Sequence, residues 1–148
     1  MKNKVPPPIV TLICTLLIYL SKPFFPDLIF NYSDQISLFF FISGLSIILI
    51  SFQRFKKEKT TINPIKIEKA SSLVTNGIFK YSRNPMYLGM VLILISISIK
   101  FNFYGGILIV AGFLVFITQF QIIPEEKAML KLFGKEFIKY KKQTRRWV

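Results

Sequence analysis

A polar stretch between residues 71 and 89 leads directly into an apolar run that continues to residue 99. Asn84 and Pro85 within it are typical of a helix start, because Asn can cap a helix and Pro fits the first position, where no N–H is needed. Arg83 precedes them, and a guanidinium can bind a carboxylate through two parallel hydrogen bonds. Without further evidence Arg83 is better explained as an anchor among lipid headgroups, so the sequence by itself indicates a chemically rich loop at the entrance to an apolar helix.

A second chemical feature is the adjacent carboxylate pair Glu125 and Glu126, which follows Pro124 after the last apolar segment. Carboxylates in the first turn of a helix are favoured by the helix dipole, and this alone could explain the pair. Alternatively, they contact cationic or hydroxyl groups of a ligand. Gln119 and Gln121 lie just before them, where polar side chains either mark a site or sit among lipid headgroups.

Several kinds of chemistry are excluded by composition. The chain has no histidine and one cysteine, Cys14, so a Ser-His or Cys-His nucleophile and a histidine-rich or cysteine-rich metal site are ruled out. No glycine-rich phosphate loop or dinucleotide-binding fingerprint is present. We expect no metal, and any nucleotide-like cofactor must be held outside a Rossmann fold.

Two ordered blocks resemble the isoprenylcysteine carboxyl methyltransferase family and its relatives, the phospholipid methyltransferases. The resemblance covers about residues 60 to 148. The matching residues are Leu73-Val74-Thr75, Gly77-Ile78-Phe79 and Arg83-Asn84-Pro85-Met86-Tyr87-Leu88-Gly89 in the first block, and Glu125-Glu126, Phe133-Gly134-Lys135-Glu136-Phe137 and Tyr140 in the second.

The resemblance implies an S-adenosylmethionine-dependent methyltransferase. It places Arg83 and Glu126 in catalytic positions and Gln121 at the substrate. The cofactor-binding residues that it implies are Leu73, Val74, Phe79, Asn84, Pro85, Met86, Tyr87 and Glu125.

The expected acceptor is the carboxylate of a lipophilic, isoprenylcysteine-like molecule, which needs no general base because it is already ionised at neutral pH. A phospholipid or other lipid amine is the alternative, and a Glu could remove its proton. An NADPH-dependent membrane reductase and a non-enzymatic membrane protein are further alternatives. Two departures leave the acceptor open: Asn84 stands where the family has His, and Gln121 where the prenylcysteine enzymes have Arg.

These residues must be positioned by an apolar framework. Apolar residues make up 52% of the 148 residues, and the mean hydropathy of +0.49 is high for a soluble chain. We predict a single all-α integral membrane domain over residues 1–148, with a cytoplasmic loop over 54–84 and a cytoplasmic tail with a helix over 124–148. The predicted membrane spans are residues 5–20, 35–52, 86–99 and 103–123.

Charge placement predicts the orientation of these spans. Of the 20 Lys and Arg residues, all but Lys22 and Lys100 lie before the first predicted span, between the second and third, or after the fourth. Positive residues concentrate on the cytoplasmic side of membrane proteins, so both termini are expected in the cytoplasm. The net charge of +13 then reflects topology and contact with membrane lipids, and no nucleic-acid partner is expected.

Overall fold

The computed structural model describes residues 5–26, 28, 31–58 and 72–148, and its regular elements there are all helical. Part of the predicted 54–84 loop, with its lysines at 59, 66 and 69, therefore lies outside the described residues, as do Lys2 and Lys4. The elements are α1 (Pro7–Leu20), the 3₁₀ turn η1 (Lys22–Phe24), α2 (Ser33–Lys57), the 3₁₀ turn η3 (Gly77–Lys80), α3 (Pro85–Phe101), α4 (Phe103–Ile117), the π-helical turn η4 (Thr118–Ile122) and α5 (Ile123–Gln143).

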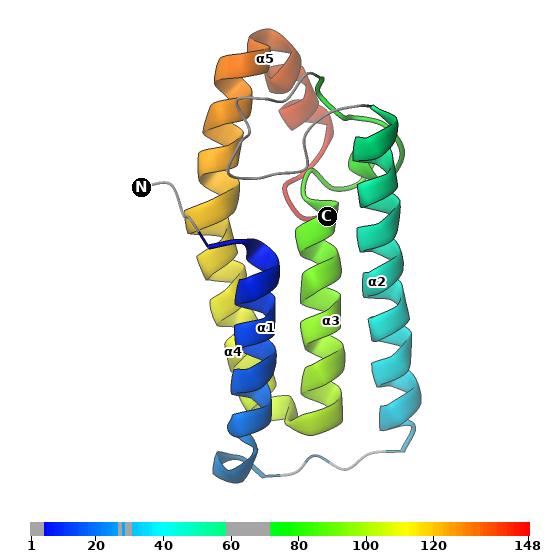
Figure 1. Cartoon of the computed structure of the whole chain (residues 1–148), viewed down its shortest axis with the longest axis vertical. Helices are drawn as coiled ribbons and strands as arrows, with labels where there is room; N and C mark the ends of the chain where they lie inside the picture. The colour runs from blue at the N-terminus through cyan, green and yellow to red at the C-terminus, as the bar shows by residue number, and fades with distance from the viewer. Residues whose placement is uncertain (1–4, 27, 29–30, 59–71) are drawn as a thin grey trace.

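Helix α3 lies at the centre of the bundle and packs against α1, α2 and α4 (Figure 1). Its Leu94 is fully buried with Ile18 of α1 and Ile117 of α4, and these side chains form the apolar core. The start of α3, where the conspicuous polar residues stand, is therefore held in place by three neighbouring helices.

Two glycines allow α2 and α3 to approach closely. A Cβ at Gly44 would lie 2.6 Å from the carbonyl oxygen of Gly89, and a Cβ at Gly89 would lie 2.7 Å from that of Gly44. Such backbone contact is possible only for residues without a side chain. Gly89 is the last residue of the first polar block, so this contact also fixes the position of α3 along the axis of α2.

A tight turn joins α3 to α4, between the predicted spans 86–99 and 103–123. The side chain of Asn102 accepts a hydrogen bond from the backbone N–H of Gly105 at 3.1 Å and so caps α4. Its amide also donates to Ser21 Oγ at 2.8 Å, which ties the turn to the end of α1.

The predicted boundary after residue 123 coincides with a change of helix type. Helix α5 continues α4 through the π-helical turn η4, so that the chain stays helical from Phe103 up to the kink at Gly134 (Figure 1). Pro124 has no N–H to donate to the preceding turn, and an ordinary α-helix would clash with its ring. The wider π turn accommodates this change in hydrogen bonding, and such turns are frequent at functional sites.

Two of the described helices, Ser33–Lys57 and Phe103–Gln143, are long and apolar enough to cross a membrane. Helices α1 and α3 lie where the spans 5–20 and 86–99 were predicted. With 14 and 17 residues they are shorter than the roughly 20 residues that a helix needs to cross a bilayer. Large apolar side chains point outward from the bundle, which lipid can cover. Examples are Leu12, Leu16, Leu38, Phe39, Ile42, Leu108 and Val115.

Candidate functional site

The polar end of the bundle contains a pocket between the start of α3, the start of α5 and the returning end of α5. Its open space, part of which is open solvent, is ≈ 600 Å³. The lining residues are Phe55, Ser72, Leu73, Val74, Phe79, Arg83, Asn84, Glu125, Glu126, Met129, Phe137 and Tyr140.

An apolar wall closes one side of the pocket because α5 bends back. Gly134 has φ 44° and ψ −117°, a conformation that favours glycine and breaks the helix. The second half of α5 then returns over the loop before α3, where Phe137 and Tyr140 pack on Val74 and Phe79. The Tyr140 hydroxyl donates to the Phe79 carbonyl oxygen at 2.6 Å and anchors this wall.

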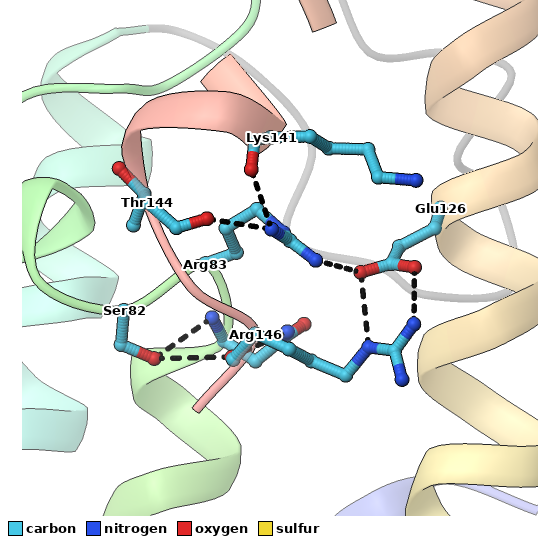
Figure 2. A network of polar contacts seen from close by, with 7 residues as sticks. Ser82, Arg83, Glu126, Lys141, Thr144 and Arg146 are labelled. Atoms are coloured by element: carbon cyan, nitrogen blue, oxygen red, sulfur yellow. Dashed lines mark hydrogen bonds and ion pairs between the residues drawn. The ribbon is translucent and has the colours of Figure 1, made fainter. Parts of the chain in front are cut away.

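An ion-pair network joins the two polar blocks (Figure 2). Glu126 accepts hydrogen bonds from Arg83 Nη2 at 2.6 Å and from Arg146 Nη2 at 2.8 Å. The Arg83 and Glu126 side chains are only 9% and 12% exposed, so this pair is screened little by water. Burial alone would raise the pKa of Glu126, but the hydrogen bonds and charges of Arg146 and Arg83 outweigh it and hold that pKa below its usual value.

The segment after α5 lies against the loop before α3. Arg83 donates through Nη1 to the carbonyl oxygen of Thr144 at 2.6 Å, and its backbone N–H donates to that of Arg145 at 3.0 Å. The Asn84 side chain donates to the Arg146 carbonyl oxygen at 3.0 Å. Asn84 thus precedes α3 as expected, but the predicted side-chain cap is wrong, because its amide is used by this segment and makes no capping bond.

Glu125 has surroundings quite different from those of its neighbour. Its Oε1 accepts hydrogen bonds from the Tyr87 hydroxyl at 2.5 Å and from Gln121 Nε2 at 3.0 Å. Burial raises the pKa of Glu125 to about 7, although the hydrogen bonds from Tyr87 and Gln121 act in the opposite direction. One carboxylate of the pair is therefore firmly ionised and the other titrates near neutral pH, an arrangement suited to proton transfer.

Two buried polar atoms lack a hydrogen-bond partner in the described part of the chain, and both belong to this region. They are Nε of Arg83, a residue that lines the pocket, and Oε1 of Gln121. Gln121 is only 4% exposed. An unpaired buried polar atom is costly unless a ligand satisfies it, so these atoms offer one donor and one acceptor to a bound molecule.

Most of the residues expected from the resemblance come together here. Leu73, Val74, Phe79, Arg83, Asn84, Glu125 and Glu126 line the pocket. Tyr87 and Gln121 reach it through Glu125. Pro85 and Met86 start α3 but do not line the pocket.

Sequence reasoning missed several contributors. Phe55 and Met129 looked like ordinary apolar residues, and Arg146 was counted only among the cytoplasmic cations. The stripe of Phe133, Phe137 and Tyr140 was the available signal for the aromatic wall. No group of three or more His, Cys, Asp or Glu that could hold a metal occurs within the described ranges.

The described residues form a helical bundle that has a polar pocket at one end and contains two helices long and apolar enough to cross a membrane. The family model described as "Phospholipid methyltransferase" matches residues 34–136, and the chain belongs to this family. Membership indicates a membrane methyltransferase. An uncharacterised protein of Haemophilus influenzae is 38% identical over 63 residues, which are 43% of this chain and 100% of that protein. No solved structure matches the chain.

Proposed function

We propose that the protein transfers a methyl group from S-adenosylmethionine to a lipophilic acceptor within the membrane. The pocket that contains Glu125 and Glu126 carries this proposal. It combines buried charge, aromatic walls and the unsatisfied Nε of Arg83, and the unsatisfied Oε1 of Gln121 belongs to a residue hydrogen-bonded to Glu125. S-adenosylmethionine would supply an activated methyl group. The protein then needs mainly to align the acceptor and exclude water.

The residues of the pocket fit this cofactor. Phe79 and Phe137 offer apolar surface for the adenine. Arg83 has an unused Nε–H that can bind the carboxylate of the methionine part. Glu126 is ionised and retains acceptor capacity beyond its bonds to two arginines, so it can accept from an ammonium or a ribose hydroxyl.

For the acceptor, the contacts around Glu125 favour a lipid amine. Gln121 Oε1 can accept an N–H, and Glu125 Oε2 accepts no hydrogen bond from the described residues. An ammonium must lose its proton before it can attack a methyl group, and a carboxylate that titrates near 7 is matched to this task. We therefore assign Glu125 as general base, whereas the resemblance placed Glu126 in the catalytic position and Glu125 at the cofactor.

The carboxylate of an isoprenylcysteine-like molecule is the second candidate, and the sequence resemblance is what favours it. A carboxylate acceptor needs a cation. Arg83 and Arg146 are both engaged by Glu126, and Gln121 occupies the position where the prenylcysteine enzymes have Arg. An acid would therefore meet Glu125 without a compensating charge.

Cofactor binding tests the proposed activity directly. The purified protein in detergent should bind S-adenosylmethionine, measured by isothermal titration calorimetry, and should not bind NADPH. The negatively charged phosphates of NADPH would meet the carboxylates Glu125 and Glu126 in a pocket with no glycine-rich phosphate loop. Binding of NADPH alone would overturn the methyltransferase proposal in favour of a reductase, and binding of neither would favour a non-enzymatic role.

We further propose four membrane spans with both termini in the cytoplasm. The distribution of Lys and Arg supports this, since 18 of 20 cluster on one side of the predicted spans. Alkaline phosphatase, which is active only outside the cytoplasm, should give no signal when fused after Val148. The same reporter inserted in the turn at Asn102 should be active. The reverse pattern, or activity at both positions, would contradict this topology.

A further inference from the structure

Arg146 contacts Glu126 more extensively than Arg83 does. Its Nε donates to Glu126 Oε1 at 3.2 Å and its Nη2 donates to Oε2 at 2.8 Å. Arg83 donates to Oε1 alone. Among the described residues, only Arg146 reaches Oε2, and hydrogen bonds to both oxygens fix the plane of a carboxylate.

The backbone of Arg146 is held as firmly as its side chain. Its carbonyl oxygen accepts a hydrogen bond from Asn84 Nδ2 at 3.0 Å. It also accepts one from Ser82 Oγ at 3.4 Å (Figure 2). The next residue, Trp147, packs against the apolar core of the bundle. Arg146 therefore bridges the loop before α3 and the start of α5, which are about forty residues apart in sequence.

Arg146 does not itself line the pocket, whereas Glu126 does. Its effect on a ligand must therefore pass through the carboxylate that it orients. A carboxylate held by two guanidinium groups keeps its charge and its direction before a ligand arrives, and such preorganisation reduces the ordering needed on binding.

We infer that Arg146 is a positioning residue for the cofactor site: it orients Glu126 toward the pocket and locks the two polar blocks together. This rests on the proposed binding of S-adenosylmethionine. In the sequence, Arg145 and Arg146 are two adjacent and equivalent residues of a basic segment, and only the structure distinguishes them. The Arg145 side chain is exposed and makes no hydrogen bond or ion pair in the described part of the chain.

The test compares Arg146→Gln with the matched control Arg145→Gln, which removes the same charge one residue away. Arg146→Gln should weaken S-adenosylmethionine binding about tenfold, the equivalent of one charge-assisted hydrogen bond. Arg146→Lys should recover part of this loss, since Lys can donate to one carboxylate oxygen. Arg145→Gln should bind like the parent. The dissociation constant for S-adenosylmethionine is measured by calorimetry for the parent and the three variants.

A double-mutant cycle separates positioning from a general effect on folding. If Arg146 acts through Glu126, adding Arg146→Gln to Glu126→Gln should cause no further loss of affinity. A tenfold loss in both backgrounds would overturn the inference, as would parental affinity of Arg146→Gln. Thermal unfolding of each variant in detergent identifies loss of fold, which would lower affinity in both backgrounds. A parent protein that binds no S-adenosylmethionine would instead overturn the proposed function.

Discussion

Replacing Glu125 with Gln should lower the rate of methyl transfer to a lipid amine by about a hundredfold or more, the usual contribution of a general base. The amide has nearly the same size and can still accept a hydrogen bond from Tyr87, whose hydroxyl lies 2.5 Å from Glu125 Oε1. It cannot take a proton from the acceptor. The affinity for S-adenosylmethionine should change much less than the rate, and single-turnover kinetics with saturating cofactor measure the difference.

The pH dependence gives this prediction a sharper form. The pKa of Glu125 is raised to about 7 by burial, so the carboxylate is largely protonated below that pH and cannot act as a base. The rate of the parent enzyme should therefore rise as the pH increases through about 7 and level off above it, until the amine itself begins to titrate. The Glu125→Gln variant should lack this rise.

Glu136→Gln is the matched control, because Glu136 is an exposed carboxylate on the same helix and does not line the pocket. It should keep both the parental rate and the parental pH profile. If Glu125→Gln transfers methyl groups at the parental rate, Glu125 is not the base. If it lowers the rate but leaves the pH profile unchanged, Glu125 positions the acceptor and does not remove its proton. That result would fit a carboxylate acceptor, which needs no general base.

Replacing Gln121 with Arg should reverse the preference between acceptor classes. Gln121 is buried and donates to Glu125 at 3.0 Å, so a guanidinium there would pair with that carboxylate. The added cation would repel an ammonium. It would also keep Glu125 ionised in an ion pair, so that Glu125 could no longer accept a proton from the acceptor. Methylation of a lipid amine should fall by at least about tenfold, a change of 1.4 kcal/mol. Binding of a lipid acid with the same chain should become tighter.

Two controls separate charge from size and location. Gln119→Arg adds the same cation at an exposed position two residues earlier and should leave the acceptor preference unchanged. Gln121→Met removes the amide without adding charge, and should weaken amine binding without improving that of the acid. The measurement is the ratio of kcat/KM for the two lipids. An unchanged ratio in Gln121→Arg would place residue 121 outside the acceptor site.

The amino-acid sequence by itself determined the helical framework and the location of the two polar blocks. Long apolar runs must either be buried or face lipid, so the sequence predicted helices α2 and α4 from their apolar residues alone. Local chemistry also predicted the entry of α3 at Pro85, and the predicted spans 86–99 and 103–123 left only a short turn at Asn102 between α3 and α4. Each of these depends on a few adjacent residues, and adjacency is what a sequence records.

The tertiary structure alone decided what the two carboxylates do. Glu125 and Glu126 are neighbours in a first helical turn and look equivalent in sequence. The fold turns one toward Tyr87 and Gln121 in a buried position, and the other toward Arg83 and Arg146. Their pKa values move in opposite directions because burial, hydrogen bonding and charge depend largely on partners far away in sequence: Tyr87, Arg83 and Arg146 are 38, 43 and 20 residues from the carboxylates that they contact. The distinction between Arg145 and Arg146 arises in the same way.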